Sequence, residues 1–204
     1  MPKKEVPTFR LLRREWSKRL ENTPGSSIIA LAKHLVPLGP WERGMAYEII
    51  LHHRQAQEVL RPKDVSTLGR GIHSWGEVDG FACFVAGPAW REHRISDRQV
   101  RTWAESPDLW WRRAALVSTV PLNKSARGGT GDVGRTLKIC RMLVHDREDM
   151  VVKALSWALR ELSKRDRSAV ESFMKRYAQG LAPRVIREVS NKLKTGVKNP
   201  RRYR

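Results

Sequence analysis

The sequence has few cysteines and no long apolar run, and each shortage excludes a class of protein. Its two cysteines, Cys83 and Cys140, lie in no CxxC or Cys/His spacing. This usage is typical of a reduced intracellular protein, here expected in the cytoplasm, that lacks a zinc site. No apolar run approaches the roughly 20 residues that span a bilayer. The first twenty residues also lack the apolar stretch of a secretory signal, so we expect neither a membrane segment nor export.

Acidic residues are also scarce. The 204 residues include 21 Asp and Glu against 40 Lys and Arg, for a formal net charge of +19. The basic residues reach well beyond one tail, so the excess predicts a polyanionic partner, most often nucleic acid. A hydrophobic fraction of 40% and eight tryptophans indicate a folded chain rather than a disordered one.

Alternating β-branched patterns are nearly absent, whereas apolar residues recur at helical spacing along most of the chain. Ser106-Pro107-Asp108 has the chemistry of a helix start with Ser106 as the cap, and Ser96 and Asp132 are weaker caps. We therefore predict an all-α fold. The expected helices lie near 9–21, 26–36, 40–58, 62–71, 74–86, 96–105, 107–120, 132–145, 148–164, 168–179 and 182–195.

One faint internal repeat suggests how these helices are arranged. Arg113-Ala-Ala is echoed forty residues later by Lys153-Ala-Leu at a matching helical position, and forty residues is the length of a HEAT-type helix pair. The echo favours an α-solenoid of antiparallel helix pairs with a concave basic face. We expect one HEAT-like repeat domain over residues 1–195 and a basic C-terminal tail over 196–204.

The expected helix 148–164 carries two distinct stripes. One is apolar and predicted to be buried, and it consists of Val151, Leu155, Ala158 and Leu162. The other places Trp157 among the cations Lys153, Arg160 and Lys164. Two interpretations are open: the indole packs on a neighbouring helix with basic stems around it, or the stripe is a nucleic-acid face that offers cations to phosphates and an aromatic plane to a sugar or base.

Two further segments join tryptophans with charged residues. Trp75 and Asp79 are four residues apart and share one helical face. Asp79 either forms an ordinary salt bridge with Arg70 or Arg113, or serves a purpose on a surface that faces DNA. In Leu109–Leu116, Trp110 and Arg113 share a face, and Arg113 is either a structural ion-pair partner or a phosphate clamp.

Taken together, these segments resemble the AlkD-like DNA alkylation repair glycosylases, which are built of HEAT-like repeats. The resemblance is carried by Trp75-x-x-x-Asp79, Trp110-x-x-Arg113-Ala-Ala and Lys153-Ala-x-x-Trp157-x-x-Arg160-Glu161, in this order, and by the Leu38–Arg43 helix start. It extends from about residue 31 to residue 193. Some members have two adjacent aromatics where this chain has Ser74-Trp75-Gly76.

The resemblance implies a monofunctional DNA glycosylase that excises positively charged N3- and N7-alkylpurines, such as 3-methyladenine and 7-methylguanine, from duplex DNA. The implied catalytic-cleft residues are Asp79, Trp75 and Trp157. Arg113 would clamp a phosphate, and Lys153, Arg160 and Trp110 would add DNA contacts. Related proteins that lack the cleft carboxylate are thought to bind DNA without excision, so Asp79 favours an enzyme.

Two other classes of function stay open at this point. One is a non-enzymatic HEAT-like module that binds nucleic acid by shape and charge, and the other is a protein scaffold, which does not account for the charge. We expect no metal and no organic cofactor, because the histidines lack partners at ligand spacing. The glycine-rich segment 125–134 lacks the Gly-Lys-Ser/Thr ending of a phosphate-binding loop and is predicted to be a connection. The expected partner is alkylated double-stranded DNA, bound by a monomer.

Overall fold

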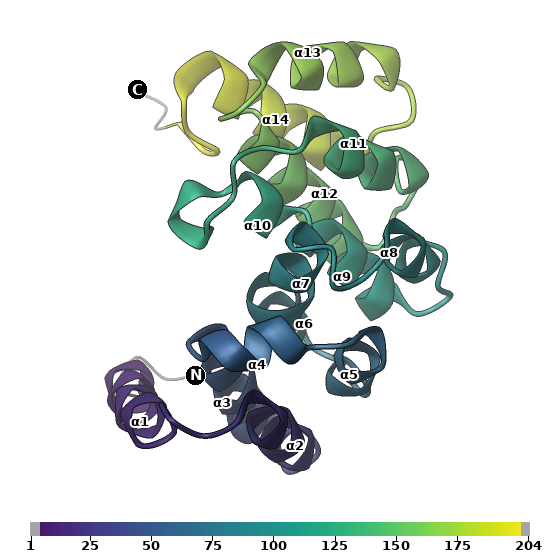
Figure 1. Cartoon of the computed structure of the whole chain (residues 1–204). Coiled ribbons are helices and arrows are strands. Elements are labelled where there is room, and N and C mark those ends of the chain that lie inside the picture. The colour runs from purple at the N-terminus through teal and green to yellow at the C-terminus, as the bar shows by residue number, and fades with distance from the viewer. Residues whose placement is uncertain (1–4, 201–204) are drawn as a thin grey trace. The chain divides into compact units, whose positions relative to one another are not determined.

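Helices make up all the regular structure of residues 5–200, the part of the chain that this computed structural model describes (Figure 1). The predicted all-α fold class is confirmed. The chain divides into two compact units, the first ending at Ile95 and the second beginning at Ser96. A single HEAT-like domain over residues 1–195, with a concave basic face, stays a prediction.

The first unit contains short helices separated by tight connections. They are α1 (Glu5–Arg19), α2 (Gly25–Leu35), α3 (Pro40–Leu51), α4 (Arg54–Val59), α5 (Pro62–Leu68), α6 (Trp75–Phe81), a π-helical turn η1 (Ala82–Ala86) and α7 (Gly87–Arg91). Helix α3 lies at the centre and packs against α1, α2, α4, α6 and η1. The core of this unit therefore forms around α3, whose residues Ala46, Tyr47 and Ile50 are fully buried.

The predicted helix 40–58 is wrong in one respect, because it is broken at His52-His53. The backbone turns at His53, whose ring Nδ1 accepts a hydrogen bond from the amide of Ala56 at 3.1 Å and caps α4. Nε2 of the same ring lies 3.2 Å from the carbonyl oxygen of Leu20. The imidazole thus replaces the helical hydrogen bonds that are lost at the break, and His53 is buried for this structural reason.

The helix that starts at Trp75 continues further than predicted. The predicted helix 74–86 ends just before Gly87-Pro88, yet α6, η1 and α7 form one unbroken helical run from Trp75 to Arg91. Proline lacks the amide hydrogen that an α-helix requires at an interior position. The π turn at 82–86, in which the Gly87 amide donates to the carbonyl of Ala82, inserts one extra residue just before Pro88. The turn thus lets the helix continue through the proline.

The second unit is built around α12. Its helices are α8 (Asp97–Ala104), α9 (Leu109–Val117), α10 (Val120–Asn123), a 3₁₀ turn η2 (Ser125–Arg127), α11 (Val133–Met142), α12 (Asp149–Leu162), α13 (Arg167–Arg176) and α14 (Pro183–Thr195). Helix α12 packs between α9 and α14, while α8 packs on α9 and both α11 and α13 pack on α12. A row of helices with a second set packed on it is typical of an α-solenoid.

Side-chain caps fix where several of these helices start. Ser96 and Asp132 cap α8 and α11, as predicted. The cap predicted at Ser106 is wrong, because α9 starts two residues later and its cap is Asp108, whose carboxylate accepts from the Trp110 amide at 2.8 Å. Ser106 Oγ accepts from the Asp108 amide at 3.2 Å instead. The charged carboxylate is the stronger acceptor, so it sets the first turn.

Residues 196–198, which follow α14, fold back onto the same helix. Lys198 Nζ lies 3.2 Å from Oε1 of Glu188, a carboxylate that is only 4% exposed. Ser156 Oγ donates to the other oxygen of Glu188 at 2.6 Å. Burial alone would raise the pKa of Glu188. The hydrogen bonds from Ser156 and Lys198, and the positive charges of Lys198 and Arg160, outweigh burial and lower this pKa below its usual range.

We expect Glu188→Gln to destabilise the protein by about 2 kcal/mol at pH 7, because a charge-assisted hydrogen bond is lost in the interior. Since the folded pKa of Glu188 is lowered, its charge stabilises the fold above the unfolded value of about 4.3. That contribution is lost as the pH falls through the folded pKa. Urea unfolding at pH 7 and near pH 3 measures the free energy of unfolding of the wild type and of Glu188→Gln. The difference between these two free energies should be smaller near pH 3 than at pH 7. Glu171→Gln, in an exposed pair with Arg167, is the control; a difference independent of pH would contradict the assignment.

Candidate active site

Trp75 and Asp79 lie on the first turns of α6, as the sequence predicted. Trp75 is 62% exposed, an unusual degree of exposure for the largest apolar side chain. Asp79 is half-buried, one turn further along. The first unit therefore presents an exposed indole next to a partly shielded carboxylate on one helix.

A reciprocal cap holds the start of α6 in place. Ser74 Oγ accepts from the Glu77 amide at 3.4 Å, and Glu77 Oε2 accepts from the His73 amide at 2.9 Å. Glu77 is buried and uses its carboxylate for this cap. These two hydrogen bonds hold the backbone of the first turn of α6, from which Trp75 extends.

The connection before α6 is anchored to α3. Tyr47 donates its hydroxyl hydrogen to the carbonyl of Leu68 at 2.8 Å, and Arg43 Nη1 donates to the carbonyl of Arg70 at 3.1 Å. Burial raises the pKa of Tyr47 to about 12, which keeps the hydroxyl protonated as a donor. Arg43 belongs to the helix start that carries part of the family resemblance, and in the structure it positions the segment that leads into α6.

The remaining predicted site residues belong to the second unit. Arg113 of α9 is only 5% exposed, and its Nη1 donates to the carbonyl of Met150 at 2.6 Å. The guanidinium is therefore held against the first turn of α12. Trp110 is half-buried on the same helix, and so is Trp111, whose ring packs on Trp103 at 5.3 Å. Neither Trp110 nor Trp111 is a fully buried core residue.

The two stripes predicted for α12 are confirmed. Val151, Leu155, Ala158 and Leu162 are buried, whereas Lys153, Trp157 and Arg160 are half-buried and Lys164 is exposed. Lys153 Nζ lies 2.6 Å from Asp149 Oδ2, one turn earlier. The face that carries Trp157 thus has solvent access and is bordered by cations.

The sequence did not reveal what holds Arg160. Its Nε donates to Ser156 Oγ at 3.1 Å, and that hydroxyl donates in turn to the buried Glu188. The sequence does contain an indication of this contact, because Glu188 lies between Val185 and Val189 on the buried face of α14. A carboxylate at such a position needs hydrogen-bond donors from a neighbouring helix.

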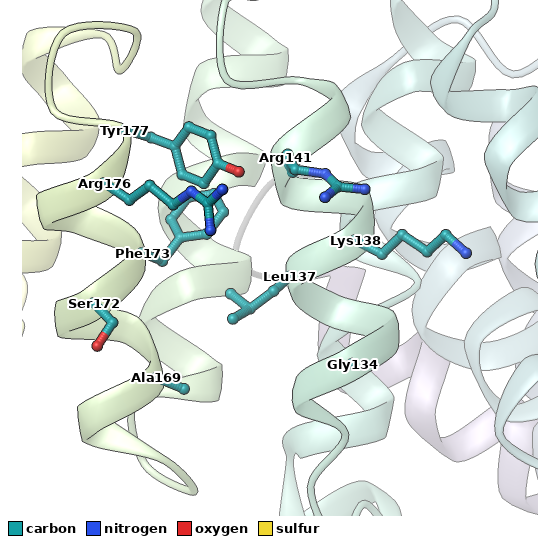
Figure 2. A pocket seen from close by; sticks show the side chains of 9 residues that line it. All are labelled: Gly134, Leu137, Lys138, Arg141, Ala169, Ser172, Phe173, Arg176 and Tyr177. Atoms are coloured by element: carbon teal, nitrogen blue, oxygen red, sulfur yellow. The ribbon is translucent and has the colours of Figure 1, made fainter.

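A pocket of about 530 Å³ opens elsewhere in the second unit, between α11 and α13 (Figure 2). Its apolar lining includes Leu137 and the rings of Phe173 and Tyr177, whose centroids lie 4.7 Å apart. The cations that line it are Lys138, Arg141 and Arg176. None of the predicted site residues lines this pocket, so its shape gives no support to the predicted chemistry.

Within residues 5–200, no three His, Cys, Asp or Glu side chains are grouped so that they could hold a metal ion. In the same range, no helix combines the length and the apolar character needed to cross a membrane.

Comparison with known families now decides the relationship that the residues suggested. A family model described as DNA alkylation repair enzyme matches residues 5–193. The chain belongs to this family. A comparison with curated proteins returns no match. Membership confirms the resemblance, and it indicates a role in the repair of alkylated DNA. The match extends over both units, and therefore over α6 as well as α9, α12 and most of α14.

Proposed function

We propose that this DNA alkylation repair enzyme is a monofunctional DNA glycosylase that releases positively charged N3- and N7-alkylpurines from duplex DNA. The observation that supports this most is the pair on α6, where an exposed Trp75 lies one turn from the half-buried Asp79. The indole of Trp75 is too exposed to serve the core. An indole and a carboxylate together suit a cationic sugar and base.

The reaction needs little from the protein. Alkylation at N3 or N7 puts a positive charge on the purine, so the base leaves as a neutral molecule. The C1′–N bond breaks, its electron pair goes to the base, and positive charge develops on the deoxyribose. A water oxygen then bonds to C1′ and gives up a proton. No acid is needed for the leaving group, so one carboxylate both stabilises the sugar cation and orients the water.

The electrostatic stabilisation that one carboxylate gives to the sugar cation is large enough to account for a substantial increase in rate. A carboxylate at about 4 Å from the developing charge, at an effective dielectric constant near 20, contributes about 4 kcal/mol. If expressed entirely in the barrier, that corresponds to roughly a thousandfold in rate. Partial burial of Asp79 supports a value well above that in bulk water.

Further residues would hold the DNA. Trp75 and Trp157 would pack against the sugar and the cationic base, with contacts that each contribute about 0.5–2 kcal/mol. Arg113, Lys153 and Arg160 would contact phosphates, and Trp110 would add an aromatic contact. The fixed orientations of Arg113, on the Met150 carbonyl, and of Arg160, on Ser156, favour this role because less side-chain freedom is lost on binding.

Base release decides between the enzyme and its alternative, a HEAT-like module that binds nucleic acid without chemistry. We expect the purified monomer to release 7-methylguanine and 3-methyladenine from methylated duplex DNA without added metal and without cutting the strand. Released base is measured by chromatography. Salt-sensitive binding without release would support the binding module instead, and neither release nor binding would leave only a scaffold.

A further inference from the structure

Two cations from two helices of the second unit pair with one exposed carboxylate, and a third cation is bound next to it. Asp149, the first residue of α12, has Oδ2 at 2.6 Å from Lys153 Nζ and Oδ1 at 3.1 Å from Nη1 of Arg184 in α14. Arg113 of α9 donates to the carbonyl of Met150, the next residue, and its positive charge also acts on Asp149. These four residues are called the Asp149 cluster below.

The cluster has the composition of an anion site that is already occupied. Helices α9, α12 and α14 are neighbours in one row; α12 and α14 each pair one cation with the Asp149 carboxylate, and α9 places Arg113 on the adjacent Met150 carbonyl. The four residues hold three positive charges and one carboxylate, so the cluster keeps a positive excess. Helix α12 begins here without a hydrogen bond from a side-chain cap, and its first amides add positive potential.

The Asp149 carboxylate can be displaced from these cations by another anion. The Asp149 side chain is 56% exposed, and Lys153 and Arg184 are also accessible. Exposed ion pairs of this kind contribute little to stability, so breaking them costs little. A phosphate offers the same cations more oxygens and more charge, and an arginine binds it through two parallel hydrogen bonds.

We propose that the Asp149 cluster binds a phosphate group of the DNA backbone, and that Asp149 competes with this phosphate for Lys153, Arg184 and Arg113. Arg184 is then a DNA-binding residue that the family resemblance did not indicate. The inference rests on the proposed function only in taking duplex DNA as the partner. The competition weakens binding to any duplex, damaged or not, and so favours release of undamaged DNA.

Asp149→Asn tests the competition, with Glu171→Gln as a matched control. Both changes remove one negative charge and one exposed pair with a residue four positions away, and both lie in the second unit. Binding to an undamaged duplex is measured by fluorescence anisotropy over a range of salt concentrations. We expect Asp149→Asn to bind about tenfold more tightly, with a salt dependence steeper by about one unit. The control should change affinity less than about twofold.

Arg184→Gln completes the test. This change should weaken binding to the undamaged duplex. When Asp149→Asn is made in the Arg184→Gln background, the increase in binding free energy should be less than half of the increase that Asp149→Asn gives in the wild type. Equal gains for Asp149→Asn and Glu171→Gln would mean that only net charge matters, and weaker binding by Asp149→Asn would mean that the carboxylate merely anchors its neighbours. Either result overturns the proposal. The readout involves no base release, so failure of the glycosylase assay leaves this test intact.

Discussion

Asp79→Asn is expected to lower the rate of base release by about a thousandfold while binding to duplex DNA is kept or slightly strengthened. Asparagine has nearly the same shape, but it carries no charge to stabilise the sugar cation and is a poor acceptor for a water proton. Single-turnover release of 7-methylguanine measures the first effect, and anisotropy with an undamaged duplex measures the second. Because Asp79 is half-buried on a capped helix, the variant should stay folded.

The control for Asp79→Asn is Glu58→Gln in α4. It removes one negative charge from the same unit, at a carboxylate that pairs with Arg54 on the surface. Base release should stay within about twofold of the wild type. If Asp79→Asn loses both binding and its melting transition, Asp79 is a structural residue and the proposed chemistry is wrong.

Trp75→Ala is expected to slow base release by about ten- to thirtyfold without lowering the melting temperature. Its indole is 62% exposed, so little apolar area returns to water on truncation. The loss of activity comes from the contacts with the sugar and the cationic base, which are worth about 2 kcal/mol at most. Circular dichroism and single-turnover release together separate the two effects.

Trp90→Ala is the matched control for Trp75→Ala. Trp90 lies on the same helical run but is only 1% exposed, and its truncation should destabilise the fold by about 3–5 kcal/mol. A melting temperature that drops equally in both variants would show that Trp75 supports the core. An unchanged rate of release in Trp75→Ala would remove it from the site.

The sequence predicted those features that depend on local chemistry. Ser96 and Asp132 mark real helix starts because a cap needs only a side-chain acceptor and the next amides. The two stripes of α12 follow from helical spacing alone. For the same reason Trp75 and Asp79 were correctly placed on one face of one helix.

Features that depend on contacts between distant segments were missed. The break at His53 needs the Leu20 carbonyl as well as the local cap. The anchoring of Arg160 needs Glu188 from α14, and the Asp149 cluster needs Arg184 from that helix. Spacing along one helix cannot indicate which side chain a second helix brings to it, so only the structure reveals these partners.

The extra residue in the π turn at 82–86 changes the rotational phase of the helical run in the first unit. In an α-helix one residue corresponds to about 100° around the axis. The turn therefore offsets the direction of Trp75 and Asp79 from that of Trp90 by roughly this angle, compared with an uninterrupted helix. Converting this turn to regular α-helix at unchanged length would rotate the indole and the carboxylate relative to Trp90 by that angle, whereas deleting one residue between Phe81 and Gly87 would restore regular helical hydrogen bonds and keep their present relative direction.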